Sequence, residues 1–241
     1  MGVLAERPRI DLSHSGVPEA AWLPVLRALP GRRPGALFAS ASRMVVVTPH
    51  PDDETLGVGG IIAATAGTAL PVTVVSVTDG EAAMKVSGLG ALRRGELAAA
   101  LGHLAPGAEL ISVGLPDGDV ARHVDELRAC LHGVLRRDDV VLAPLPDDGH
   151  PDHDAAGAVA VAAAAATGAP CWTYPVWAWH WHDPRTSRVT GGVRVALPLP
   201  AWHAKQGAIE CYGSQIRGGD PVVPPFAMPR YRRRCEVVVA A

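Results

Sequence analysis

Short apolar runs of strand length alternate along this chain with longer segments in which apolar positions recur at helical spacing. The runs are rich in β-branched residues, which favour strands, and residues 72–78 are β-branched almost throughout. The predicted strands cover residues 43–48, 72–78, 110–113, 140–144, 171–177, 193–199 and 235–239. The predicted helices cover residues 56–67, 91–104, 119–137, 154–167 and 202–212.

This alternation predicts an α/β fold in which a Rossmann-like, doubly wound, mostly parallel sheet carries helices on both faces. The C-terminal part is less regular, and we expect α+β structure there. We predict a single domain over residues 43–241, preceded by an N-terminal extension of residues 1–42, with a surface loop over residues 218–229. In the common strand order 3-2-1-4-5, the first and fourth strands are neighbours where the winding reverses, and ligands bind beyond their carboxyl ends.

The composition sets modest bounds on function. The formal net charge is -2 over 241 residues, which gives no electrostatic case for binding nucleic acid or an anionic membrane surface. The 4 cysteines are dispersed without a C-x-x-C pair, so we predict reduced thiols rather than disulfides or a thiolate metal site.

No segment of the sequence is typical of a signal peptide or a membrane span. Residues 1–40 carry charges and prolines but no uninterrupted apolar core, and the Ala-rich residues 155–169 are too few and too weakly apolar to cross a bilayer. Abundant Ala, Gly and Pro, with almost all basic charge on Arg, is typical of a GC-rich bacterial gene. We therefore expect a cytoplasmic bacterial protein without stable membrane insertion.

Two clusters of metal-binding side chains follow the first and fourth predicted strands. The sequence HPDDE at residues 50–54 places one imidazole and three carboxylates within five residues, and HPDHD follows at residues 150–154. A single His-Pro-Asp in a loop is usually a turn whose Asp caps the next helix. Two such clusters in matched positions, brought together by the predicted strand order, indicate one mononuclear metal site instead.

The residue types in these clusters suit hydrolysis of an amide. A catalytic zinc typically has three protein ligands and a water, and His50, His153 and one carboxylate of the first cluster would make such a set. The adjacent carboxylate could take the proton of the water, and His150 could stabilise an oxyanion or protonate a leaving amine. Two imidazoles and one carboxylate also suit Fe²⁺, Co²⁺ or Ni²⁺.

The two clusters, as HPDDE at residues 50–54 and HPDH at residues 150–153, resemble the two signatures of the PIG-L/LmbE superfamily. These proteins are zinc-dependent de-N-acetylases that act on N-acetylglucosamine conjugates and related N-acyl sugars. Weaker matches are TDGEA at residues 78–82, RRGEL at 93–97, LPDG at 115–118, WAWHW at 177–181, KQGAI at 205–209 and SQ at 214–215. The resemblance covers residues 43–216 and implies a deacetylase whose substrate is an amino-sugar conjugate.

The resemblance also implies roles for the metal-binding and acid–base residues of the two signatures. It implies zinc ligation by His50, Asp53 and His153. It implies that Asp52 is the general base and that His150 stabilises the oxyanion or acts as the acid.

Further residues are predicted to support or contact the substrate. The resemblance implies that Asp152 orients His150 through a hydrogen bond, and that Arg93 and Asp117 face the sugar. Residues 172–182 hold four of the six tryptophans, which would form either a packed core segment or an aromatic wall for a sugar or acyl chain. In the second interpretation Trp179 is our candidate for substrate binding. Asp148 stands where some family members carry a Tyr that assists the oxyanion.

Two alternatives remain beside the deacetylase. An amidase that cleaves a thiol-sugar conjugate could use the same site, and a catalytically silent module could keep the fold and bind a glycoconjugate. The intact set of ligand, base and acid residues argues against the silent module. The GVGG sequence at residues 57–60 suggests a dinucleotide site, but Ile62 stands where the third glycine is needed. We expect these glycines to let the helix pack closely on the sheet.

Overall fold

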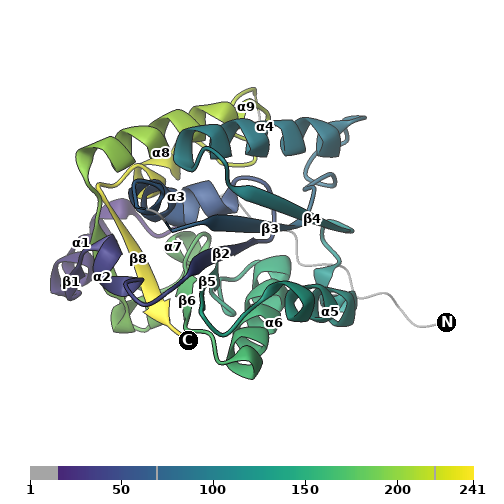
Figure 1. The fold of residues 1–241 in the computed structure, drawn as a ribbon. Helices are drawn as coiled ribbons and strands as arrows, with labels where there is room; N and C mark the ends of the chain where they lie inside the picture. The colour runs from purple at the N-terminus through teal and green to yellow at the C-terminus, as the bar shows by residue number, and fades with distance from the viewer. Residues whose placement is uncertain (1–15, 69, 220) are drawn as a thin grey trace.

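A twisted sheet forms the centre of the molecule, with helices packed on both of its faces (Figure 1). The computed structural model describes residues 16–68, 70–219 and 221–241. Within these residues the sheet has the strand order β1-β7-β8-β6-β5-β2-β3-β4. The strands are β1 (Gly31–Arg32), β2 (Arg43–Thr48), β3 (Val72–Thr78), β4 (Glu109–Leu115), β5 (Asp139–Pro144), β6 (Cys171–Tyr174), β7 (Val193–Ala196) and β8 (Cys235–Ala240).

The winding of the central strands confirms the prediction from alternation. Strands β4, β3, β2, β5 and β6 are parallel neighbours in that order, which is the predicted order 3-2-1-4-5. The strand β8 is antiparallel to both β6 and β7, so the sheet is mostly parallel and its C-terminal part is mixed. The first and fourth predicted strands, β2 and β5, are hydrogen-bonded neighbours at the point where the winding reverses.

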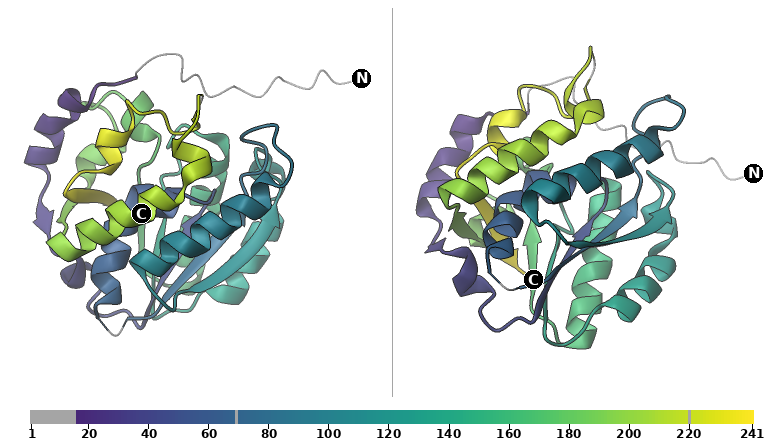
Figure 2. Two further views of the ribbon diagram at one scale, coloured as in Figure 1. Left: turned by 90° about the horizontal axis from the view of Figure 1, so that it is seen from above. Right: turned by 45° about the horizontal axis from the view of Figure 1, so that its top comes forward.

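The two faces of the sheet are covered by two groups of helices. One face carries α3 (Asp53–Ala66), α4 (Leu89–Leu104) and α8 (Leu199–Cys211), and Figure 2 shows α4 and α8 running side by side. The other face carries α5 (Val124–Val134) and α6 (Pro151–Thr167). Because successive strand residues point to opposite faces, Met44 packs with the first group and Val45 with the second. Burial on both faces explains the continuous apolar run in β2.

Shorter helices connect the main elements. They are α1 (Glu19–Ala28), α2 (Pro34–Leu37), η1 (Val120–Arg122), α7 (Ala178–Trp181), η2 (Arg188–Gly191), α9 (Gly213–Ile216) and α10 (Met228–Tyr231). Among the described residues, none of the helices combines the length and the apolar character that crossing a membrane requires.

Two predicted elements are shorter in the structure because distant carboxylates bind their backbone amides. The predicted strand 171–177 ends at Tyr174, and the N–H groups of residues 176–178 donate to Asp148 rather than to a neighbouring strand. The predicted helix 119–137 is divided into η1 and α5, and the N–H of Val120 donates to Asp152 at 3.1 Å. Such long-range acceptors leave no trace in local periodicity.

The described part of the predicted N-terminal extension shares the sheet and the core with the rest of the chain. The strand β1 pairs with β7, and Trp22 is fully buried with its Nε1 donating to the carbonyl of Trp179 at 2.8 Å. The predicted surface loop 218–229 is also partly internal, because Val223 and Ala227 are buried. Its described residues therefore form a loop that is exposed in part, at residues 218–219 and 225–226, as we expected, and buried in part.

A break divides α3, the helix that begins at the first motif. Val58 has non-helical backbone angles, with φ -137° and ψ 16°. The carbonyl of Leu56 accepts a hydrogen bond from Lys205 Nζ at 2.9 Å. The N–H groups of Gly60 and Ile61 donate to the two carboxylate oxygens of Glu236, each at 2.7 Å.

The partners at this break form a buried ion pair. Lys205 Nζ lies 2.6 Å from Glu236 Oε1, and both side chains are almost inaccessible to solvent. The lysine donates to a carbonyl at the C-terminal end of one half-helix, and the glutamate accepts from amides at the N-terminal end of the next. A positive charge at a helix C-terminus and a negative charge at an N-terminus are both favourable. The pair thereby takes the place of the missing helical hydrogen bonds.

The glycines of α3 confirm the predicted close packing. A Cβ at Gly57 would lie 2.3 Å from the ring of Tyr174 on β6, and one at Gly60 would lie 2.3 Å from Leu197. Gly59 has only ordinary contacts. The motif therefore serves helix packing at two of its three glycines.

We expect the substitution Lys205→Met to destabilise the protein by about 3–5 kcal/mol, because it leaves the buried carboxylate of Glu236 without its counter-charge. Urea unfolding followed by circular dichroism measures the change. The exposed pair between Arg217 and Glu210 provides the control, and Arg217→Met should cost less than about 1 kcal/mol. Equal losses in the two variants would contradict the role given to the buried pair.

Candidate functional site

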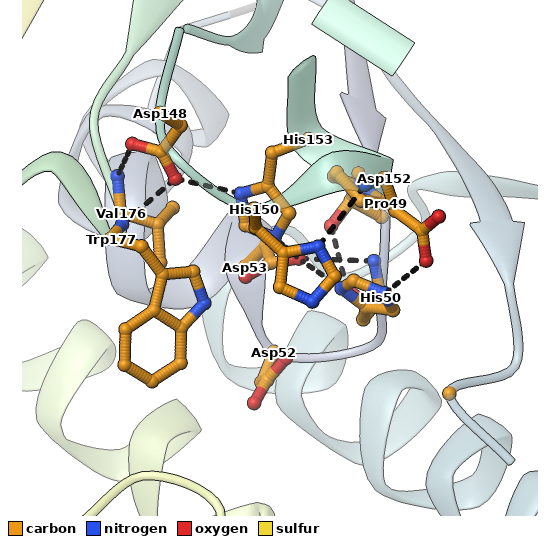
Figure 3. A network of polar contacts seen from close by, with 12 residues as sticks. Pro49, His50, Asp52, Asp53, Asp148, His150, Asp152, His153, Val176 and Trp177 are labelled. Carbon is orange, nitrogen blue, oxygen red and sulfur yellow. Dashed lines mark hydrogen bonds and ion pairs between the residues drawn. The ribbon is translucent and has the colours of Figure 1, made fainter. Parts of the chain in front are cut away.

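Two loops meet at the carboxyl ends of β2 and β5 (Figure 3). The first carries His50 and Asp52 and leads into α3 at Asp53, and the second carries His150 and leads into α6, which holds His153. The rings of His50 and His153 lie 5.3 Å apart, and that of His150 lies 4.8 Å from both. The structure therefore brings the two predicted clusters together at the switch point of the sheet.

One set of atoms in this cluster could hold a metal ion. His50, Asp53 and His153 each offer one ligand atom, all within 4.8 Å of one another, and all three residues are buried. Asp53 Oδ2 lies 3.1 Å from His50 Nδ1 and 3.1 Å from His153 Nε2. These are the three residues predicted as ligands.

In His50 and His153, the ring nitrogen that points away from Asp53 faces another carboxylate. His153 Nδ1 lies 2.8 Å from Asp148 Oδ2, and His50 Nε2 lies 3.2 Å from Asp152 Oδ2. Metal-binding histidines in proteins are usually held in this way, since the outer carboxylate fixes the tautomer and the ring orientation. Each ring is thus oriented with one nitrogen toward the centre of the cluster.

The hydrogen bonding of the cluster fits a divalent metal. His153 Nε2 is buried and has no hydrogen-bond partner among the described residues, although it lies beside Asp53. A buried polar atom that makes no hydrogen bond calls for an explanation, and a role as metal ligand beside Asp53 supplies one. A second set, His50, His150 and Asp152, fits less well because the carboxylate of Asp152 already accepts from the N–H groups of Gly118 and Val120.

The protonation of the cluster is strongly perturbed. Burial lowers the pKa of His153, but Asp53 and Asp148 outweigh it and raise that pKa to about 9. Burial raises the pKa of Asp53, but His153 and His50 hold it well below its usual range. Without a metal the His153 imidazole thus keeps a proton that a metal would displace, as expected for a ligand. Burial and the charges of His153 and His50 lower the pKa of His150 to about 2.

Asp52 occupies a strained turn between the strand and the helix. Among the described residues it is the one non-glycine with a positive φ, at 134°. The Asp52 N–H donates to Glu54 at 3.2 Å, and Glu54 accepts from the Tyr212 hydroxyl at 2.5 Å. Burial raises the pKa of Asp52 to about 7, and the charge of Arg93 opposes the rise. Strain of this kind collects at functional sites, where the surroundings enforce it.

The second motif differs in one contact from the prediction. We expected Asp152 to orient His150, and a hydrogen bond joins them, but the donor is the backbone N–H of Asp152 to His150 Nδ1 at 3.1 Å. The carboxylate of Asp152 faces His50 instead. His150 is the N-cap of α6, whose first turn places Asp152 and His153 on the site.

Comparison with known proteins places this site in a family. Residues 45–164 match the PIG-L family, described as GlcNAc-PI de-N-acetylase, and both motifs lie within that segment, one near each end. The chain belongs to the PIG-L family.

Relatives and solved structures agree with this assignment. The chain is 34% identical over 155 residues to a 1D-myo-inositol 2-acetamido-2-deoxy-alpha-D-glucopyranoside deacetylase of Rhodococcus erythropolis, covering 51% of this chain and 53% of that protein. The chain thus spans about half the length of the curated relatives that it matches.

Two solved structures share the fold. The N,N'-diacetylchitobiose deacetylase from Pyrococcus horikoshii aligns with a TM-score of 0.66 at 21% identity, covering 85% of each chain. The conserved protein TT1542 from Thermus thermophilus aligns with a TM-score of 0.62 at 29% identity, covering 81% of this chain and 93% of that one. The first likeness shows the PIG-L fold alone.

A cavity of about 500 Å³ opens over the site of this PIG-L domain. Its lining includes Asp117, which lies 3.1 Å from His50 Nε2 and accepts from the N–H of Ala82 at 2.8 Å. Arg93 also borders the cavity, but its guanidinium donates to the carbonyls of Gly80 and Pro51 and to Asp52. Arg93 therefore anchors the turn of the first motif, and its contact with a sugar stays a prediction.

The structure places the predicted aromatic residue elsewhere. Trp179 is buried in the core, where its ring meets Trp22 edge-on at 4.8 Å and Arg233 lies 4.2 Å from its centroid. It does not line the cavity, whereas Trp177 does. Trp177 and Trp179 point in different directions because the helix α7 begins at Ala178. In a helix, unlike a strand, side chains two residues apart lie on different sides.

Asp148 is the residue whose role the sequence analysis missed. It is fully buried, holds His153 and accepts hydrogen bonds from the N–H groups of residues 176–178 at 2.8–2.9 Å. Its position before the second motif was noted only as a replacement for Tyr. The signal that could have indicated its role is an aspartate in the loop after a buried strand, five residues before a predicted ligand.

We expect Asp148→Asn to weaken metal binding by about 10–100-fold, because an amide cannot hold His153 Nδ1 and three backbone N–H groups together. Competition titration against a chromophoric chelator measures the affinity, at a temperature where circular dichroism shows the variant folded. Asp147→Asn is the matched control, since Asp147 is half-exposed and pairs with Arg188. Unchanged affinity in a folded Asp148→Asn protein would contradict this assignment.

Proposed function

We propose that this chain is a zinc-dependent hydrolase that removes the N-acetyl group from an N-acetylglucosamine-type conjugate. The observation that carries the proposal is the convergence of His50, Asp53 and His153 beside Asp52 and His150 in one cavity. The cavity volume is in the range of about 300–1,000 Å³ that is usual for small-molecule sites. The relative from Rhodococcus is named as a deacetylase of an inositol conjugate of 2-acetamido-2-deoxyglucose, which is N-acetylglucosamine, and this supports the proposed sugar.

Asp52 is the proposed general base. Its carboxylate borders the cavity, and Arg93 Nη2 holds one oxygen at 3.1 Å. Because Arg93 fixes the side chain, the other oxygen is free to accept a proton from water as that water attacks the acetyl carbon. The same carboxyl group can then deliver the proton to the nitrogen as the carbon–nitrogen bond breaks, which yields acetate and a free amine.

His150 is proposed to donate a hydrogen bond to the oxyanion rather than to act as the acid. Its Nδ1 accepts from the N–H of Asp152, so the proton of the neutral ring resides on Nε2. Burial and two neighbouring imidazoles keep this ring neutral. A neutral N–H that is already in place suits stabilisation of charge that develops on the acetyl oxygen.

His50, Asp53 and His153 are the residues that would hold the metal. A divalent ion bound there supplies an acidified water and polarises the acetyl carbonyl. Two imidazoles and one carboxylate are typical ligands of catalytic zinc, and Fe²⁺, Co²⁺ and Ni²⁺ accept the same donors.

The test is a mass-spectrometric screen of N-acetylglucosamine conjugates for loss of acetyl, run with the zinc-loaded chain and repeated after chelation. Deacetylation that disappears with chelator and returns with added zinc supports the proposal. Release of a sugar amine from a thiol conjugate alone would favour the amidase instead. Binding without turnover of any conjugate would favour the silent module.

We expect Asp52→Asn to retain the metal but to lower kcat by about 10²–10⁴-fold, because the amide cannot take up the proton. His153→Ala should lose both metal and activity, since it removes a ligand. Metal content by plasma emission spectroscopy and acetate release are measured on the same samples.

The control for these two variants is His132→Ala, a solvent-exposed histidine on α5. It should keep the metal and the activity of the unaltered chain. Full turnover by Asp52→Asn protein with normal metal content would reject Asp52 as the base while leaving the ligand set intact.

A further inference from the structure

The cavity over the site has a charged floor and an apolar rim. Its floor is formed by the two motifs with Arg93 and Asp117. Its rim comes from two loops that are far apart in sequence, residues 82–84 after β3 and residues 221–223 before α10, together with Trp177. All of these rim residues are apolar: the two loops read AAM and PVV.

No described lining residue offers a free cation to a substrate. Arg93 is the one permanently positive side chain in the described lining, it is 2% exposed, and its terminal nitrogens are committed to Gly80, Pro51 and Asp52. Lys85 follows Met84 on the loop but does not line the cavity. The floor holds three aspartates and one arginine, so a divalent metal would bring it near neutrality rather than to positive charge.

The rim residues are accessible to any part of a ligand that extends from the floor of the cavity toward solvent. Ala82 and Ala83 are exposed, while Met84, Pro221 and Val222 are half-buried. The backbone behind them is held in place, because Ala82 donates to Asp117 and the Val223 N–H donates to Gln215 at 2.9 Å. A group attached to a sugar on the floor would therefore meet apolar side chains, carried by a hydrogen-bonded backbone, as it extends toward solvent.

We propose that this site selects conjugates whose aglycone is uncharged and presents an apolar face, and that it discriminates against aglycones carrying a carboxylate or phosphate. The inference rests on the proposed function, since it concerns the part of the substrate beyond the sugar. An anionic aglycone would lose hydration against the rim, gain no cationic partner there and lie near Asp117. Discrimination of this type combines an attractive apolar contact with an unpaired charge.

The test compares three N-acetylglucosamine conjugates that differ only in the aglycone: phenyl, methyl and malate. Acetate release by the zinc-loaded full chain gives kcat and KM for each. We expect kcat/KM to fall in the order phenyl, methyl, malate, with malate on the order of tenfold or more below phenyl and the difference mainly in KM. A malate conjugate that reacts as well as the phenyl conjugate would overturn the inference.

Charge placed on the rim provides a second measurement. Val222→Lys should lower kcat/KM for the phenyl conjugate and raise it for the malate conjugate. Val86→Lys is the matched control, because Val86 is 55% exposed on the first loop and does not line the cavity. Equal effects of the two substitutions on the malate-to-phenyl ratio would contradict a role for the rim.

Binding separates failure of this inference from failure of the proposed function. Calorimetry with zinc-loaded Asp52→Asn protein and the same three conjugates measures affinity without turnover. If no conjugate loses acetyl with the unaltered chain, the proposed function fails, whereas tighter binding of phenyl than malate still supports the rim. Binding of malate at least as tight as phenyl overturns the inference whether or not deacetylation occurs.

Discussion

The break in α3 is the constraint on which the geometry of the site depends. The first turn of this helix carries Asp53, and its later part buries Ile61 and Ile62 in the core. Because the break at Val58 leaves backbone groups without helical partners, Lys205 and Glu236 must supply them. The direction of the ligand-bearing turn is thus fixed by side chains from the C-terminal α8 and β8. The C-terminal part of the chain therefore helps to position the site.

Local pattern predicted the central fold well because both faces of the parallel sheet are covered. The middle of a strand such as β2 must then be apolar at successive positions, and the run of residues 44–47 marks where that strand lies. The prediction was wrong where side chains distant in sequence replace backbone partners. Asp148 ends β6 by binding three amides, and Asp152 binds the amide that begins η1. Periodicity contains no information about such acceptors.

In the site, too, residue types predicted the candidate metal ligands, whereas the positions of the longer side chains depend on packing. The density of imidazoles and carboxylates indicated His50, His153 and one carboxylate of the first cluster, and the family resemblance chose Asp53; the structure brings all three together. Chemistry alone could not say where a long side chain points. Arg93 is drawn inward by two carbonyls and Asp52, and Trp179 lies in the core. The roles that sequence predicts most securely here are those held by short side chains next to a strand end.

The pairing of β2 with β5 has a consequence for how the protein reaches its native state. The two halves of the ligand set belong to segments about a hundred residues apart, joined only when these strands become neighbours in the sheet. An unfolded or half-synthesised chain offers no such site, so an ion that binds there binds the native state alone. Free ion at a hundred times its dissociation constant would add about 2.7 kcal/mol to the free energy of unfolding. The concentration of free metal would then influence the fraction of the protein that is folded, independently of substrate.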